Sequence, residues 1–299
     1  MNKLVAHITL QSRQCKFWGL IVALLVTAFT ASAEENFSQQ VSGEGRPVIL
    51  IPGLMSNGTV WNSVQETLTA NYEVHVLSLA GFAGTPAAKN PSLEHTMQEI
   101  GEYIKKNQLH EPVIIGHSLG GFIGFWLAVN YGERIGKVIS VDGLPYLAPV
   151  FTRSSATTVA MMQGQASMLR QQYRYFNGEQ LEQQAQANIS IQATAKQDQQ
   201  KVLAMARHSH PETVGEAIYT LLTTDLRNDL KTVTAPILLL GAVGAFTNVS
   251  QQNAAEALYQ QQLEKAPNAT LIMNRESRHF IMFDQPNWLA RQIIHFIED

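Results

Sequence analysis

The sequence predicts an α/β fold, in which a mostly parallel sheet is covered by helices on both faces. Short apolar runs alternate with amphipathic stretches along the chain. Strands that alternate with helices at this spacing indicate a parallel sheet that is covered on both faces. Between residues 144 and 230 the alternation stops, and no strand pattern appears there. We therefore predict a sheet domain made of residues 34–143 and 231–299, with a helical insertion over residues 144–230.

Each element follows from its local pattern. Six apolar runs are predicted to form strands, at residues 47–53, 72–79, 112–115, 136–141, 235–241 and 269–273. Five segments are predicted to form helices, at residues 59–70, 92–108, 121–128, 253–263 and 286–297. Ser92 stands at the start of the second of these helices and is its expected N-cap. In the insertion, spaced apolar residues such as Met162 and Tyr173 favour packed helices over a glutamine-rich linker.

The most informative motif is Gly116-His117-Ser118-Leu119-Gly120, which lies between a predicted strand and a predicted helix. A G-x-S-x-G sequence in that context is the pattern of a nucleophile elbow. The turn is so sharp that the serine must take a strained backbone conformation, and the glycines leave room where side chains would clash. Such a turn exposes the Ser118 hydroxyl. It also directs the Leu119 N–H, at the helix N-terminus, towards a developing oxyanion.

The first 33 residues have the pattern of a secretory signal peptide. Lys3, Arg13 and Lys16 precede an apolar run at residues 20–29, and the cleavage sequence Ala31-Ser32-Ala33 follows. The apolar run is shorter than the roughly 20 residues that span a bilayer, so we expect no stable membrane anchor after cleavage. The predicted location is periplasmic or secreted.

Removal of this segment changes the cysteine and charge totals. The single cysteine, Cys15, lies within it, so the mature chain can form no disulfide. The segment holds three of the 21 basic residues and none of the 24 acidic ones, which leaves 18 basic against 24 acidic residues and a net charge of −6. An acidic chain without basic clusters gives no reason to expect a nucleic acid partner.

These features resemble the α/β-hydrolase superfamily over nearly the whole mature length. Ile51-Pro52-Gly53-Leu54 is similar to the oxyanion loop of these enzymes, and residues 144–230 take the place of their helical cap. Ser277-Arg278-His279-Phe280 follows the last predicted strand, where the family keeps its catalytic histidine. Two family features are missing. Pro52 replaces the histidine common before the oxyanion glycine, and no aspartate occurs in Ser78-Leu79-Ala80-Gly81. The resemblance implies esterase-like chemistry, although many chemistries share this fold.

A serine hydroxyl becomes a good nucleophile only when an adjacent base takes its proton. Among the nine histidines, His279 lies in a loop that follows a strand near the C-terminus, which matches the family's chain order of nucleophile, acid and base. His117 lies inside the elbow, and its side chain is expected to point away from Ser118. We predict that His279 is the general base and then the general acid towards the leaving group.

The sequence indicates less directly which acidic residue would orient His279 and complete a catalytic triad with Ser118. The family's commonest site is the loop at residues 241–248, which contains no carboxylate here. The known alternative is the end of the strand after the elbow helix, where Asp142 stands. Asp142 would share the carboxyl edge of the sheet with Ser118 and orient His279, although an aspartate there can also simply cap a turn. The competing carboxylates, expected in salt bridges or helix caps, are Asp225, Asp229 and Asp284.

Backbone N–H groups complete the predicted site. Those of Leu54 and Leu119 are the candidates for the oxyanion hole, each stabilising a tetrahedral intermediate by about 3 kcal/mol. His208-Ser209-His210 offers two imidazoles without a third ligand at suitable spacing, so we predict no metal site. The methionines and aromatic residues of the insertion fit an acyl pocket and ordinary helix packing equally well.

The resulting prediction is an exported serine hydrolase that cleaves a small or medium carboxylic ester through an acyl-enzyme. Ser118, His279 and Asp142 form its catalytic set, and it requires neither a metal nor an organic cofactor. Lactones and amides use the same parts and stay open as substrates. The alternative prediction, suggested by the empty acid loop, is a non-catalytic ligand-binding protein on the same fold. Nothing in the sequence indicates an oligomeric state.

Overall fold

A seven-stranded sheet forms the centre of the molecule, in the strand order β1-β3-β2-β4-β5-β6-β7. The computed structural model describes residues 36–299, so the predicted signal peptide at residues 1–33 lies outside the described residues. Each neighbouring pair of strands is parallel except β1 and β3. The predicted mostly parallel α/β sheet is confirmed. The strands are β1 (Phe37–Ser42), β2 (Arg46–Ile51), β3 (Tyr72–Leu79), β4 (Val113–His117), β5 (Lys137–Val141), β6 (Ile237–Ala242) and β7 (Ala269–Asn274).

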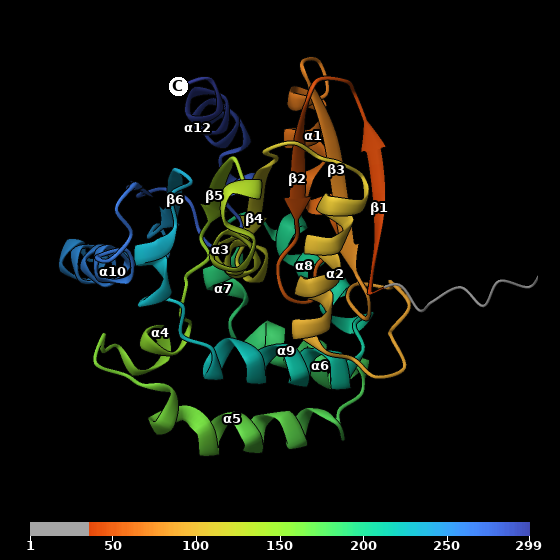
Figure 1. The fold of residues 1–299 in the computed structure, drawn as a ribbon. Helices are drawn as coiled ribbons and strands as arrows, with labels where there is room; N and C mark the ends of the chain where they lie inside the picture. Colours follow the sequence, from red (N-terminus) through yellow and green to blue (C-terminus); the bar gives the residue numbers. More distant parts are fainter. Residues whose placement is uncertain (1–35) are drawn as a thin grey trace, which may run out of the picture. The chain divides into compact units, whose positions relative to one another are not determined.

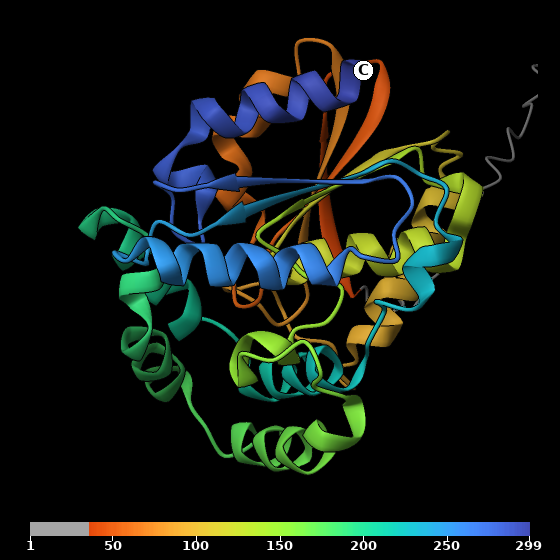
Figure 2. The ribbon, with the colours of Figure 1, turned by 90° about the vertical axis from the view of Figure 1, so that its left-hand side faces the viewer.

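Helices cover both faces of the sheet (Figure 1). Helices α1, α11 and α12 pack on one face and α2, α3 and α10 on the other; Figure 2 shows α12 (dark blue) and α10 (lighter blue) on opposite sides. Ile49 and Ile51 of β2 pack towards α3, whereas Val48 and Leu50 pack towards α12. This two-sided burial explains why residues 47–51 form an unbroken apolar run. The helices are α1 (Asn62–Leu68), α2 (Leu93–Lys106), α3 (Leu119–Tyr131), α10 (Val249–Gln262), α11 (Ile281–Asp284) and α12 (Pro286–Glu298).

The predicted elements are found at their predicted places, with small differences at their ends. Ser92 accepts a hydrogen bond from the His95 N–H and caps α2, as expected. Helix α10 begins earlier than predicted because Asn248 caps it by accepting from the Ser250 N–H. Residues 58–61 form a separate 3₁₀ turn before α1.

Strand β1 is absent from the sequence prediction. Its sequence, FSQQVS, has a single buried side chain, that of Phe37. The strand is held at the edge of the sheet by antiparallel backbone pairing with β3, from Phe37 opposite Leu79 to Ser42 opposite Val74. Backbone pairing leaves no hydrophobic periodicity in the sequence, so a polar edge strand gives no such signal.

Residues 144–230, which we call the helical insert, form six helices between β5 and β6. Within it α5 packs against α9, and α6 against α8. The insert bonds to loops that follow strand ends: Gly84 N–H donates to His208 O at 2.8 Å, and His210 N–H donates to Gly81 O at 2.7 Å. It therefore lies over the carboxyl edge of the sheet (Figure 1). Its helices are α4 (Ala148–Thr152), α5 (Val159–Tyr173), α6 (Gly178–Ala187), α7 (Ile189–Gln192), α8 (Lys196–Arg207) and α9 (Pro211–Thr223).

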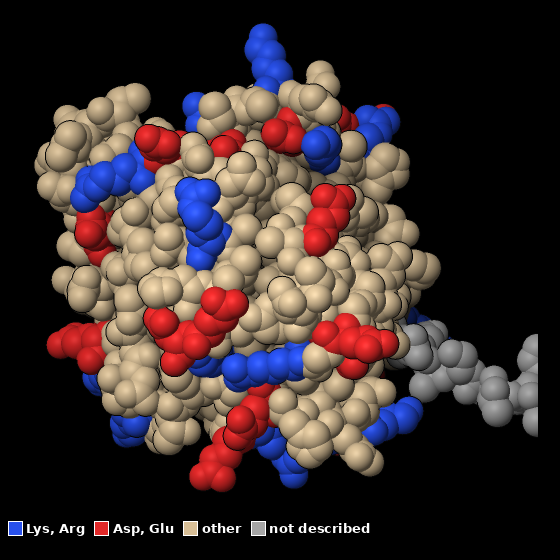
Figure 3. Space-filling model, turned by 90° about the horizontal axis from the view of Figure 1, so that it is seen from above, with Lys and Arg blue, Asp and Glu red and all other residues tan. Residues whose placement is uncertain are grey.

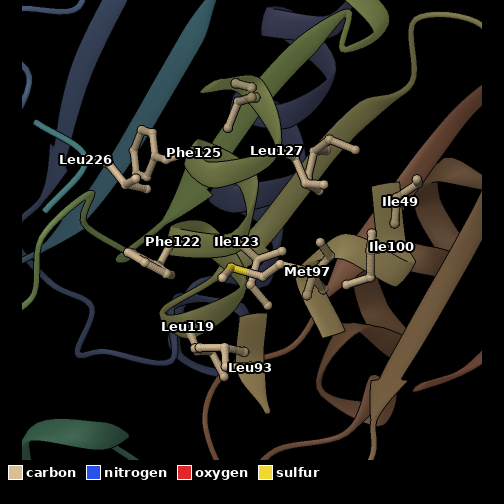
Figure 4. Packing of buried hydrophobic residues seen from close by; sticks show 14 of the residues in the cluster. Ile49, Leu93, Met97, Ile100, Leu119, Phe122, Ile123, Phe125, Leu127 and Leu226 are labelled. Atoms are coloured by element: carbon tan, nitrogen blue, oxygen red, sulfur yellow. The ribbon is translucent and has the colours of Figure 1, made fainter. Parts of the chain in front are cut away.

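Helix α3 anchors the elbow in the core. Its side chains are buried nearly all round, and Figure 4 shows Leu119 and Ile123 directed at the α2 residues Leu93 and Met97. Burying a large apolar side chain contributes about 1.5–3 kcal/mol. The packing of α3 thus holds its first residue, and the turn before it, in one position.

Within residues 36–299, the helices are all too short or too polar to cross a bilayer. On the face seen in Figure 3, acidic and basic side chains lie interspersed among neutral ones. Charges of mixed sign produce no strong field of one sign over that face.

Candidate active site

Ser118 lies at the turn between β4 and α3, with φ 52° and ψ −112°. A non-glycine residue in such a region costs about 1–3 kcal/mol and persists where its surroundings fix it. A Cβ atom on Gly116 would lie 2.0 Å from Gly120 O, and one on Gly120 would lie 2.2 Å from Ile51 O, so both positions require glycine. The Ser118 N–H donates to Val141 O at 2.9 Å and ties the elbow to β5. The turn has the geometry predicted for a nucleophile elbow.

The structure brings Asp142 and His279 together. Asp142 follows β5 directly, and its Oδ2 lies 2.6 Å from His279 Nδ1. The Asp142 side chain is 6% exposed and that of His279 25%. An ionised carboxylate only accepts hydrogen bonds, so the proton of the imidazole belongs on Nδ1. This leaves His279 Nε2 as the acceptor, which is the tautomer that a general base requires.

The second oxygen of Asp142 is also fixed. Its Oδ1 accepts hydrogen bonds from Ala242 N–H at 2.8 Å and from the Tyr259 hydroxyl of α10 at 2.9 Å. Burial, and then the charge of Asp142, raise the pKa of Tyr259 well above its usual range, so this hydroxyl stays a donor at all ordinary pH values. Asp142 itself has a left-handed φ of 53°. Three donors therefore hold the carboxylate in one orientation.

Residues 241–248, where the acid was first sought, are used differently. Val243 N–H donates to Asn274 O at 3.0 Å and Gly244 N–H to Ser277 O at 2.8 Å. A Cβ atom on Gly244 would lie 2.4 Å from the backbone of Glu276. The loop packs against the turn that leads to His279, and the carboxylate comes from the neighbouring strand β5.

One predicted oxyanion donor, Leu119, lies in the elbow itself, and the other, Leu54, lies in the loop next to it. Leu119 is the first residue of α3, so its N–H has no partner within the helix. Leu54 follows Gly53, and a Cβ atom on Gly53 would lie 3.3 Å from Ser118 Cβ and 2.7 Å from His117 Nδ1. The absence of a side chain at Gly53 allows this loop to approach the nucleophile closely.

His117 has a contact that the sequence did not indicate. Its Nε2 donates to the backbone carbonyl of His279 at 3.1 Å, and the two imidazole rings lie 4.6 Å apart. His117 is fully buried, and this burial, reinforced by His279, lowers its pKa well below the usual range. A neutral imidazole thus supports the loop that carries His279.

None of the hydrogen bonds among residues 36–299 joins the Ser118 hydroxyl to the His279 imidazole. Such catalytic hydrogen bonds are commonly long before substrate binds and shorten in the reacting complex. In the same range, no group of three or more His, Cys, Asp or Glu side chains is placed to hold a metal ion.

The competing carboxylates lie in other contacts. Asp225 forms an ion pair with Arg227 at 2.6 Å, as expected. Asp284 does not cap α12, contrary to prediction: the N-cap is Gln285, and Asp284 instead accepts hydrogen bonds from Thr194 and from the Arg278 N–H. The sequence indicated neither the bond of Tyr259 to Asp142 nor that of Asp284 to Thr194, because these partners lie far apart along the chain.

Comparison with known proteins identifies the family. Residues 46–286 match the family described as the alpha/beta hydrolase fold. The chain is 24% identical over 258 residues to a pimeloyl-(acyl-carrier protein) methyl ester esterase of Vibrio vulnificus, covering 86% of this chain and 96% of the relative. A protein of the same name from Vibrio parahaemolyticus is 26% identical over 268 residues, covering 88% and 99%.

Solved structures show the same fold. An esterase from Exiguobacterium antarcticum superposes with a TM-score of 0.71 at 19% identity, covering 88% of this chain and 96% of that chain. An enol-lactonase from Burkholderia xenovorans gives a TM-score of 0.67 at 17% identity, with coverage of 88% and 96%. The family match and the esterase relatives together confirm the prediction of a serine hydrolase of the carboxylic ester class. The chain belongs to the alpha/beta hydrolase fold family.

Proposed function

We propose that this chain is an exported serine hydrolase that cleaves small or medium carboxylic esters through an acyl-enzyme on Ser118. The observation that carries the proposal is the 2.6 Å bond between His279 Nδ1 and Asp142 Oδ2, at the sheet edge where the strained Ser118 turn lies. That bond presets the tautomer that leaves Nε2 free to accept a proton.

The reaction proceeds in two steps on these residues. Ser118 Oγ bonds to the ester carbonyl carbon while its proton passes to His279 Nε2. The carbonyl oxygen becomes an oxyanion, which the N–H groups of Leu54 and Leu119 stabilise. The bond to the alcohol oxygen then breaks, and the alcohol leaves with the proton from His279. Water repeats the sequence on the acyl-enzyme, releasing the acid and restoring Ser118. Asp142 orients the imidazole and stabilises its charged form throughout.

The non-catalytic alternative rested on the missing carboxylate in residues 241–248. A carboxylate bonded to His279 exists nonetheless, supplied from β5 and held by two further donors. This favours catalysis over simple ligand binding. A fluorophosphonate probe that labels the wild type supports the proposal, whereas an unlabelled, well-folded wild type favours a binding protein.

The substrate is proposed to enter beneath the helical insert, which acts as the cap over the carboxyl edge of the sheet. A panel of p-nitrophenyl esters of graded acyl length measures activity and pocket size together. Methyl esters belong in the panel because the curated relatives are named methyl ester esterases. A lactone and an amide complete it, since both can form the same acyl-enzyme. Preference for the lactone or amide would contradict the ester assignment.

Export is proposed from the N-terminal pattern alone. Cleavage after Ala33 would leave Glu34 as the first residue of the mature protein. Mass spectrometry of the protein recovered from the periplasmic or extracellular fraction of its host tests this. An uncleaved chain in the cytoplasmic fraction would contradict it.

A further inference from the structure

The loop that carries His279 is bonded to the helical insert through its backbone. His279 N–H donates to Ile191 O at 3.1 Å, and Phe280 N–H donates to Gln192 O at 2.8 Å. The Arg278 guanidinium donates to Ala193 O at 2.9 Å. Residues 191–194, at the end of α7, therefore lie alongside residues 278–280, although about 85 residues separate the two segments in the chain. We call this pair of segments the clasp.

One carboxylate joins the two halves of the clasp. Asp284 Oδ1 accepts from Thr194 N–H at 2.9 Å, while Oδ2 accepts from the Thr194 hydroxyl at 3.0 Å and from the Arg278 N–H at 2.7 Å. Hydrogen bonds to an ionised acceptor are roughly twice as strong as those between neutral groups. Asp284 thus ties the insert to the histidine loop.

Each backbone N–H of residues 278–280 donates to the insert or to Asp284. The N–H groups of Arg278, His279 and Phe280 donate to Asp284, Ile191 and Gln192 respectively. The Asp142 bond fixes the ring through Nδ1, but it leaves the backbone position of His279 to these contacts and to His117. A loop with all three N–H groups bonded has little freedom to shift, and a displacement of about 1 Å at a catalytic group can cost about a hundredfold in rate.

We infer that Asp284 is a positioning residue for His279, and that it places the base by fastening the histidine loop to Thr194 of the helical insert. This rests on the proposed function, because positioning matters only if His279 acts as the base. The helical insert then has a second role besides covering the site: it sets the geometry of the catalytic histidine.

Three variants test the inference. Asp284→Asn keeps the shape but replaces one acceptor oxygen with a donor, so at least one of the N–H groups now bonded loses its partner. Thr194→Val removes only the hydroxyl, and Thr194→Ser restores it. Matched controls in the insert are Glu182→Gln, whose carboxylate pairs with Arg207 at 2.8 Å, and Thr220→Val, whose hydroxyl bonds to Glu216 O at 3.1 Å.

The measurements are kcat and KM for a short p-nitrophenyl ester, the rate of fluorophosphonate labelling, and the melting temperature. For Asp284→Asn we expect kcat and labelling to fall between about tenfold and a hundredfold, with KM within about threefold. Thr194→Val should show a smaller loss of kcat that Thr194→Ser reverses, and both controls should match the wild type.

Two results would overturn the inference. Folded Asp284→Asn and Thr194→Val proteins with wild-type kcat and labelling would show that the clasp does not position the base. If Asp284→Asn fails to fold, Thr194→Val and its serine rescue decide. A wild type that neither hydrolyses esters nor takes the probe would refute the proposed function itself, and the inference with it.

Discussion

Replacing Tyr259 with phenylalanine removes one atom from the environment of Asp142. The Tyr259 hydroxyl donates to Oδ1 at 2.9 Å, and the Ala242 N–H, which the substitution leaves in place, donates to the same oxygen at 2.8 Å. A hydrogen bond to a charged group contributes about 1.5–3 kcal/mol. Because one donor remains, we take the lower end, about 1.5 kcal/mol, as the loss in the transition state. That loss corresponds to about a tenfold fall in kcat.

The assay is ester hydrolysis at neutral pH with purified wild type and variant. Tyr219→Phe is the matched control, because its hydroxyl accepts a hydrogen bond from Gln163 on the insert, at 2.8 Å, and does not bond to Asp142. The control should show the wild-type kcat. A folded Tyr259→Phe protein whose kcat matches the wild type would refute the assignment of this hydroxyl to the acid.

Three further predictions concern other parts of the site. Asp142→Asn should lower kcat by about four orders of magnitude while the melting temperature stays close to that of the wild type, and near-normal turnover would remove Asp142 from the triad. Gly53→Ala should lower kcat about a hundredfold, because its Cβ would lie 2.7 Å from His117 Nδ1; unchanged kinetics would place the oxyanion loop elsewhere. Burial lowers the pKa of His117 in the folded protein, so below about pH 6.5 the unfolded chain binds more protons than the folded one. The free energy of unfolding of the wild type should therefore fall by up to about 1.4 kcal/mol for each pH unit below that value. In urea unfolding at pH 5 and 7, His117→Gln should reduce this dependence, and an equal slope in both proteins would contradict it.

The fold could be predicted from the sequence because its signals are local. A strand buried on both faces is apolar over most of its length, as residues 47–51 of β2 are, and the elbow glycines stand beside the serine that requires them. Strand β1 gave no such signal, since its side chains are mostly exposed and backbone pairing with β3 holds it in place.

The site could be predicted only where chain order indicated it. His279 and Asp142 follow strand ends, so the parallel sheet brings them to one edge. The contacts of Tyr259 and Asp284 could not be predicted from the sequence. Each contact requires one side of a helix or turn to face a residue about 90 or more positions away in the chain. Asp284 in particular has the sequence context of a helix cap, and its contacts with Thr194 appear only once the insert is folded.

The central claim is that Ser118 is a working nucleophile activated by the pair of His279 and Asp142. The most direct measurement is labelling of the intact protein with a fluorophosphonate probe, followed by mass spectrometry of the modified peptide, beside Ser118→Ala. The account predicts one label, on Ser118, in the wild type and none in the variant. A folded wild type that stays unlabelled, or a label that persists in Ser118→Ala, would contradict it.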